Sequence, residues 1–165
     1  MTKIGLLSDT HGYLDPKIYK YFAEVDEIWH AGDVGDVSVI DELKEFKPVR
    51  GVYGNIDSSD VRLELPEFQR FKCEDVNVLM THIGGKPGKY VPRAHYEISK
   101  NPPKLFICGH SHILLVKNDP RYNMLWMNPG ACGFKGFHQV KTLLRFSISG
   151  DQIHDLEVIE LGKRI

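Results

Sequence analysis

The sequence predicts an α/β protein with two stacked sheets and helices on their outer faces. In the first half, short apolar runs alternate with helical patterns, which favours parallel strands joined by right-handed crossovers. In the second half, strand-like runs follow one another between turn-forming residues, which is typical of antiparallel strands. The 165 residues fit one domain spanning residues 1–165, since domains usually have roughly 100–200 residues.

The first half is expected to contain three strands and two helices. The strands are expected at residues 4–7, 25–31 and 49–53. A first helix is expected to have Asp15 as its N-cap and Pro16 at its first position. The three-residue spacing of Ile40, Leu43 and Phe46 predicts a second helix.

The second half is expected to contain one helix, between Pro92 and Lys100, and a series of strands. The strands are expected as two runs within 71–81, then at 105–108, 113–117, 123–127, 141–147 and 152–161. Turn segments such as Asn128-Pro129-Gly130 separate the last four runs, which predicts an antiparallel meander.

Composition excludes several classes of protein. The net charge of −1 gives no overall field that would attract nucleic acid or an acidic membrane. Cys73, Cys108 and Cys132 are an odd, widely spaced set, so we expect no disulfide framework, a buried structural thiol at Cys108 and a reducing compartment. With neither a secretory signal nor a membrane-spanning apolar run, the sequence favours a cytoplasmic location.

Residue types that bind metals follow five of the expected strands. These residues are Asp9 and His11, Asp33, Asn55, His82, and His110 and His112. In open α/β sheets, ligands bind in the crevice outside the carboxyl ends of the strands. Five strand ends that bring carboxylate, amide and imidazole groups into one crevice predict a polynuclear metal site.

Each of these residues also has an ordinary structural interpretation. Asp9 could accept backbone N–H groups, Gly32-Asp33 and Gly54-Asn55 are common turn pairs, and His82 could be a hydrogen-bonded core histidine. A glycine directly before Asp33, Asn55 and His110 is expected to let the chain turn tightly there. The joint occurrence at strand ends favours the metal site.

The motifs resemble the signature of the calcineurin-like metallophosphoesterases, and the short chain resembles their small prokaryotic phosphodiesterase branch. The motifs of this chain that carry the resemblance are Asp9-Thr10-His11, Gly32-Asp33, Gly54-Asn55-Ile56-Asp57, Thr81-His82 and Gly109-His110-Ser111-His112. The resemblance implies a four-layer α/β/β/α sandwich of two mixed sheets.

The resemblance also implies a dinuclear metal centre. Asp9, His11 and His112 would bind one cation. Asn55, His82 and His110 would bind the other, and Asp33 would bridge both. We assign catalytic as well as metal-binding roles to Asp33, Asn55 and His82.

Charge and ligand chemistry indicate hydrolysis of a small phosphodiester by a metal-bound hydroxide. Two divalent cations with two carboxylates keep a charge of roughly +2, which attracts phosphate. Two such cations activate a shared water and hold the phosphoryl oxygens. Imidazole and carboxylate ligands suit Mn²⁺, Fe²⁺ and Zn²⁺ and disfavour Ca²⁺. Of the three suitable cations we expect Mn²⁺.

One residue departs from the pattern of many relatives. They carry a histidine directly after the asparagine, placed to protonate the leaving oxygen, where this chain has Ile56. General acid catalysis typically contributes about 10²–10⁴-fold, so we expect slow turnover or dependence on a good leaving group.

Two other functions are weighed against the phosphodiesterase. One is a metal-stabilised interaction scaffold with little or no catalysis, because the eukaryotic retromer scaffold subunit is similar in fold. The other is a nuclease of the same superfamily, which the absence of a basic stripe disfavours. A nucleotide substrate stays open, and the sequence does not predict the oligomeric state.

A few residues outside the ligand set are also candidates. Lys86, Lys89 and Arg93 could reach the far end of a substrate, or belong to a solvated loop. His30 could support a ligand or be an ordinary core histidine, and Asp57 is expected to brace its loop.

Overall fold

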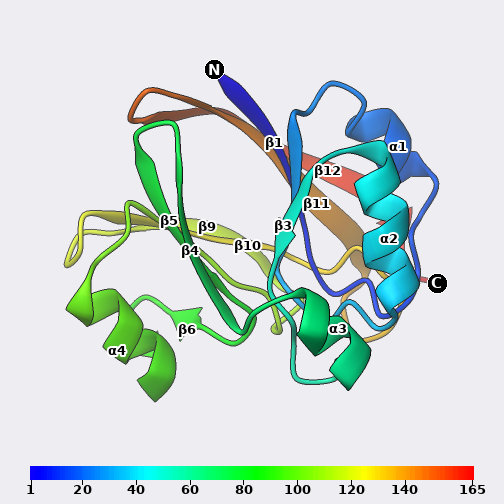
Figure 1. Cartoon of the computed structure of the whole chain (residues 1–165), viewed down its shortest axis with the longest axis horizontal. Helices are drawn as coiled ribbons and strands as arrows, with labels where there is room; N and C mark the ends of the chain where they lie inside the picture. The colour runs from blue at the N-terminus through cyan, green and yellow to red at the C-terminus, as the bar shows by residue number, and fades with distance from the viewer.

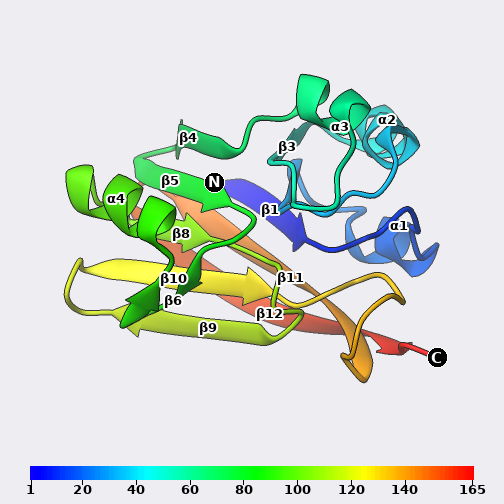
Figure 2. The same cartoon turned by 90° about the horizontal axis from the view of Figure 1, so that it is seen from below.

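The computed structural model describes residues 1–165, and its main feature is a pair of five-stranded sheets (Figures 1 and 2). The first sheet has the order β12-β11-β1-β2-β3 and the second has the order β4-β5-β8-β10-β9. The strands of the first sheet are β1 (Thr2–Leu7), β2 (Glu27–His30), β3 (Val49–Gly51), β11 (Val140–Ser149) and β12 (Gln152–Lys163). Those of the second are β4 (Phe68–Cys73), β5 (Val76–Thr81), β8 (Leu105–Ile107), β9 (Leu114–Asp119) and β10 (Met124–Pro129).

Both sheets are mixed, as predicted. In the first sheet β1, β2 and β3 are parallel, while β11 runs antiparallel to both β1 and β12. In the second sheet β5, β8 and β10 are parallel, with β4 and β9 antiparallel at the two edges. The parallel strands run from the centre to one edge of the first sheet and form the centre of the second. The candidate site lies at their carboxyl ends.

Helices cover the outer faces, which completes the four layers (Figure 1). The helices are α1 (Lys17–Tyr21), α2 (Val37–Phe46), α3 (Ser59–Glu64) and α4 (Pro92–Lys100). Ile40 and Leu43 of α2 pack with Ile28 on the first sheet, and Ile98 of α4 packs with Phe106 on the second. None of the helices has the length and apolar character that a membrane span requires.

Alternation of side chains along each strand separates the cores. Ile4 and Leu6 of β1 contribute to the cluster between the two sheets, whereas Leu7 faces the helices. Trp29 of β2 is fully buried in the cluster between the sheets. Two-sided burial explains why these strands are continuous apolar runs in the sequence.

The predicted antiparallel meander is wrong. β9 and β10 form a hairpin in the second sheet, and β11 and β12 form another in the first. The chain changes sheets after Pro129, because β10 pairs in parallel with β8 while β11 pairs with the open side of β1. Local turn signals identify the two hairpins but not the sheet that each one joins.

Three short elements and one helix end differ from expectation. The helix α3 and the two-stranded hairpin of β6 (Gly85–Lys86) and β7 (Lys89–Tyr90) were not predicted. Helix α1 begins at Lys17 rather than Pro16, and the Asp15 carboxylate accepts a hydrogen bond from the Lys17 backbone N–H at 2.9 Å. Asp15 therefore caps the first turn, although Pro16 lies just outside the helix.

Candidate metal centre

Two clusters of side chains lie where the strands end. The first cluster is Asp9, His11 and His112, and the second cluster is Asp33, His82 and His110. Within each cluster the potential ligand atoms all lie within 4.8 Å of one another. The structure thus brings together six of the seven predicted side chains, in the two groups that the family resemblance implied.

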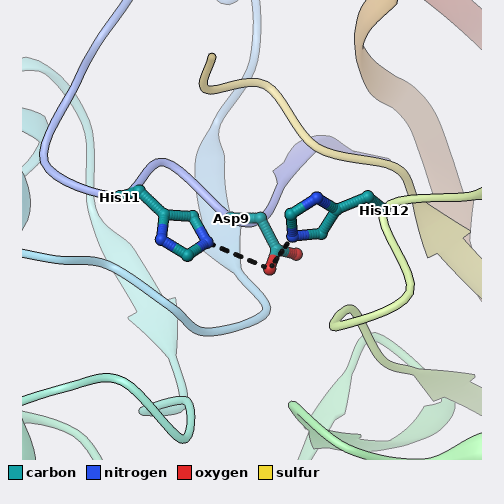
Figure 3. A group of neighbouring side chains, drawn as sticks. All are labelled: Asp9, His11 and His112. Atoms are coloured by element: carbon teal, nitrogen blue, oxygen red, sulfur yellow. Dashed lines mark hydrogen bonds and ion pairs between the residues drawn. The ribbon is translucent and has the colours of Figure 1, made fainter. Parts of the chain in front are cut away.

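In the first cluster, two imidazoles approach one buried carboxylate from opposite sides (Figure 3). His112 Nε2 lies 3.1 Å from Asp9 Oδ1, and His11 Nε2 lies 3.7 Å from the same oxygen. Asp9 follows β1, while His112 comes from the segment after β8 in the other sheet. The cluster therefore joins the two sheets.

Asp33 lies between the two clusters. Its Oδ2 is 3.2 Å from His82 Nε2 and 3.4 Å from His11 Nε2. His82 Nε2 in turn lies 3.8 Å from Asp9 Oδ1 of the first cluster. A carboxylate shared in this way has the placement that a bridging ligand requires.

Three buried imidazole nitrogens have no hydrogen-bond partner, and two of them, His11 Nε2 and His82 Nε2, lie in the clusters. His82 Nδ1 lies 2.7 Å from the Ala31 carbonyl oxygen, which can only accept, so Nδ1 carries the hydrogen of the neutral ring. Its Nε2 lone pair then faces the carboxylates, an arrangement that needs a cation between them. The donor set fits divalent transition metals, and the hydrogen bond at Nδ1 is the kind that orients histidine ligands.

Electrostatics keep the carboxylates ionised. Burial alone would raise the pKa of Asp9, but the imidazoles of His11 and His112 beside it hold it well below its usual range. Burial likewise opposes ionisation of Asp33, and the adjacent His82 ring and the Ile56 backbone N–H lower its pKa. Burial and the neighbouring His82 lower the pKa of His110, which favours a neutral, metal-binding imidazole. Both carboxylates are therefore anions at neutral pH.

The backbone at these positions is unusual. Asp9, His11, Asp33, His110 and His112 all have positive φ values, between 48° and 71°. Left-handed backbone in residues other than glycine is uncommon and concentrates at functional sites. The chain thus turns sharply at the ligands themselves.

Gly54 and Gly109 are needed for close approach rather than for a positive φ. A Cβ at Gly54 would lie 2.1 Å from Asp33 Oδ1, and one at Gly109 would lie 2.2 Å from Ser8 Oγ. The expectation of a tight turn holds at Gly32, which has a φ of 101°, whereas Gly54 and Gly109 have no positive φ and the left-handed residue after Gly109 is His110.

The comparisons with known proteins agree with this geometry. The family model described as the calcineurin-like phosphoesterase superfamily domain matches residues 2–151. The chain belongs to this superfamily. It is 32% identical over 139 residues to a probable metallophosphoesterase of Methanocaldococcus jannaschii, an alignment that covers 78% of this chain and 67% of that protein.

Two solved structures show the same fold. One is an archaeal phosphodiesterase, with a TM-score of 0.78 and 23% identity over 96% of this chain and 99% of that one. The other is Vps29 from Chaetomium thermophilum, with a TM-score of 0.75 and 15% identity over 99% and 100% of the two chains. At these identities the similarity concerns the fold alone.

Asn55 and Ile56 lie at the rim of the candidate metal centre. Asn55 is exposed and lines the same pocket as His82. The Ile56 backbone N–H donates to Asp33 Oδ1 at 3.2 Å, and its side chain is 47% exposed. The loop thus holds one oxygen of Asp33 while the other faces the histidines.

Asp57 braces its loop, as predicted. Its buried carboxylate accepts hydrogen bonds from the backbone N–H groups of Val34 at 3.1 Å, Gly35 at 2.8 Å and Gly54 at 2.8 Å. These bonds tie the segment after β2, which carries Asp33, to the segment after β3.

His30 supports the site from the core. Its Nδ1 accepts a hydrogen bond from the Gly32 backbone N–H at 3.1 Å, so Nε2 carries the hydrogen and donates to Thr10 Oγ1 at 3.0 Å. Complete burial lowers its pKa to about 4, which keeps it neutral. His30 therefore links the segments that carry Asp9 and Asp33.

Sequence reasoning missed three supporting residues. Ser8 Oγ donates to Asp9 Oδ2 at 2.6 Å, and buried Asn128 donates to the Gly109 carbonyl oxygen at 3.0 Å. His138 packs edge-on against His112 with 5.1 Å between ring centroids. Two sequence signals could have identified supporting residues. Ser8 directly precedes Asp9, and Asn128 stands at the end of an apolar run.

The remaining candidates have definite places. Arg93 forms an ion pair with Glu67 at 2.5 Å beside His82, while Lys86 and Lys89 line a separate pocket with His110. Cys108 is buried as predicted, and burial raises the pKa of its thiol well above the usual range.

Proposed function

We propose that this chain is a metal-dependent phosphodiesterase that hydrolyses a small phosphodiester with two divalent cations in the cytoplasm. The observation that carries the proposal is the position of Asp33 Oδ2, within 3.4 Å of a histidine nitrogen from each cluster. Superfamily membership and the fold shared with an archaeal phosphodiesterase support it.

The ligands divide between two cations. Asp9, His11 and His112 would hold the first, and His82 and His110 the second, with Asn55 completing it and Asp33 shared. We propose Mn²⁺, with Fe²⁺ or Zn²⁺ as alternatives that the same ligands accept. When bound, the two cations would lower the pKa of a water molecule and neutralise charge on the phosphoryl oxygens.

The protein's own groups position the reactants. Asp57 and the Ile56 backbone N–H fix the loop that presents Asp33 and Asn55. His82 is held by its Nδ1 hydrogen bond to Ala31, so its Nε2 keeps one direction. Ile56 cannot protonate a leaving oxygen, so esters with acidic leaving groups should react fastest.

The test is hydrolysis of bis(4-nitrophenyl) phosphate by protein loaded with Mn²⁺. We expect turnover that a chelator abolishes and Mn²⁺ restores, with about two metal ions per chain. His82→Ala should remove most of the activity, whereas the control His154→Ala, at a residue hydrogen-bonded to Ser149 and Asp155 outside both clusters, should not. Loaded protein that is inert toward a broad panel of phosphoesters would contradict the proposal.

A metal-stabilised interaction scaffold is the second candidate. The fold shared with Vps29 and the isoleucine at position 56 favour it. If a chelator abolishes capture of a protein partner and no ester is ever hydrolysed, the scaffold is the correct function.

A further inference from the structure

Two pockets adjoin the second cluster. One, of about 470 Å³, is lined by His82 together with Asn55 and Arg93. The other, of about 530 Å³, is lined by His110 together with Lys86 and Lys89, and we call it the lysine pocket. The rings of His82 and His110 are 5.3 Å apart, so a phosphoryl group bound beside them has one pocket for each ester arm.

The two pockets differ in free charge. In the pocket beside His82, Arg93 is paired with Glu67 and Arg62 donates to the Asp57 carbonyl oxygen. In the lysine pocket neither Lys86 nor Lys89 forms an ion pair, and no aspartate or glutamate lines the walls. An anionic group entering the lysine pocket therefore meets two available cations and no carboxylate.

One part of the wall of the lysine pocket is apolar. Ile83, Ile113 and Leu115 are 38%, 65% and 38% exposed, and Trp126 also lines the pocket. Single exposed aliphatic residues are ordinary on protein surfaces, but these gather around one hollow. Apolar walls with a few placed polar groups are the usual composition of a small-molecule site.

The wall that carries the lysines is anchored to the second sheet. The β6–β7 hairpin belongs to neither large sheet, and its lysines line one pocket together with Leu115 of β9 and Trp126 of β10. The Val91 backbone N–H donates to the Gly84 carbonyl oxygen at 3.1 Å, and Tyr90 Oη donates to Asp119 Oδ2 at 2.6 Å. Because these bonds fix the hairpin, little ordering should be needed when a ligand enters.

We propose that the lysine pocket binds one ester arm of the substrate, and that this arm is an apolar, aromatic group carrying a second negative charge. The aromatic part would lie against Leu115, Ile113 and Trp126, and the anion would lie between Lys86 and Lys89. The assignment to an ester arm rests on the proposed phosphodiesterase function, whereas the affinity for an aromatic anion does not.

Binding is tested first on metal-free protein, with naphthalene-2-sulfonate as the probe. We expect saturable NMR shifts confined to residues 84–91 and 109–116. Lys86→Gln with Lys89→Gln should weaken binding roughly fivefold, the size expected for two exposed ion pairs. Leu115→Asp should also weaken it, whereas Val158→Asp, at an exposed apolar residue of β12, should not. Shifts elsewhere, or equal affinity for the lysine variant, would overturn the proposal.

Kinetics then test the ester arm with two 4-nitrophenyl phosphodiesters, one with a 2-naphthyl arm and one with a 6-sulfo-2-naphthyl arm. In both, water attacks phosphorus and 4-nitrophenolate leaves, and the retained arms differ in the sulfonate. We expect kcat/KM to favour the sulfonaphthyl ester by roughly fivefold, and the ratio of kcat/KM between the two esters should fall toward one in the double lysine variant.

The outcomes separate the two proposals. If neither ester reacts, the phosphodiesterase function fails, while the probe titration still decides whether the pocket binds an aromatic anion. If both esters react at equal rates, the function stands and the ester-arm assignment fails.

Discussion

The two clusters differ in how firmly the protein holds them and in what they face. In the first cluster, Asp9 is fully buried and accepts hydrogen bonds from Ser8 at 2.6 Å and from the His110 backbone N–H at 3.2 Å. In the second, Asp33 receives one backbone hydrogen bond, and His82 and His110 border the two pockets. The first cluster is therefore the more firmly held of the two, and the second borders both pockets described above.

The largest effect is expected from Asp33, the residue that connects the two clusters. Asp33→Asn keeps a residue that tolerates φ of 54° but removes the shared charge. We expect kcat/KM to fall by about 10³-fold or more. Removing a residue that only hydrogen-bonds to a metal ligand already lowers metal affinity or activity by about 10–100-fold, and Asp33 is itself a proposed ligand. Metal content should fall from two ions per chain to one, measured by elemental analysis. The exposed Asp41→Asn is the control, and unchanged activity of Asp33→Asn would show that the clusters work independently.

A smaller effect is expected from Asp57, which supports only the second cluster. Asp57→Ala leaves three backbone N–H groups without their acceptor, and we expect a loss of about 3 kcal/mol in the free energy of unfolding. Urea denaturation of the metal-free protein measures it, with the exposed Asp60→Ala as control. A free energy of unfolding no lower than that of Asp60→Ala would contradict the prediction.

The effect of pH on stability tests the link that His30 makes between the clusters. Its pKa is lowered from 6.5 to about 4 in the folded protein, so the unfolded chain binds more protons between these values. The contribution of neutral His30 to the free energy of unfolding is complete above pH 6.5 and is lost as the pH falls toward 4. From pH 6.5 to pH 4.5 we expect a loss of roughly 2 kcal/mol, measured by urea denaturation of metal-free protein. His30→Gln should remove this part of the pH dependence, and an unchanged profile would contradict it.

The smallest effect is expected at Ser8, which supports only the first cluster. Ser8→Ala removes the hydrogen bond to Asp9 Oδ2, and we expect roughly tenfold weaker binding of the more tightly held metal ion. Competition with a fluorescent chelator measures it, with Ser99→Ala on α4 as the control. If Ser8→Ala weakened only the binding of the less tightly held ion, the first cluster would not be the tighter site, which contradicts the prediction.

The sequence predicted that these side chains gather because they occupy strand ends, which the topology brings to one edge. Asp9, Asp33 and His82 each follow an apolar run, and each run became a strand of one of the two sheets. The division into two groups came from the family resemblance, and the proximity of the side chains agrees with it. Metal binding by these residues, the role of Asn55, Mn²⁺ and the catalytic roles stay predictions.

The sequence could not predict how the strands pair over long distances or which groups support the ligands. β10 and β11 are consecutive in the chain but lie in different sheets, since their partners β8 and β1 are distant in sequence. Asn128 of β10 donates to the carbonyl oxygen of Gly109, which follows the neighbouring strand β8, a contact that no local pattern encodes. The β6–β7 hairpin has two-residue strands, too short for a periodic signal.

The left-handed backbone at five of the ligands affects how mutational scanning of this protein should be interpreted. Alanine is strained at such φ values, by roughly 1–2 kcal/mol per residue. Alanine at Asp9 or His112 would therefore weaken the loop as well as delete a metal ligand, whereas His82 has no positive φ. Asparagine and glycine are the informative replacements at the strained positions, and libraries built from bulky β-branched residues would mostly report misfolding.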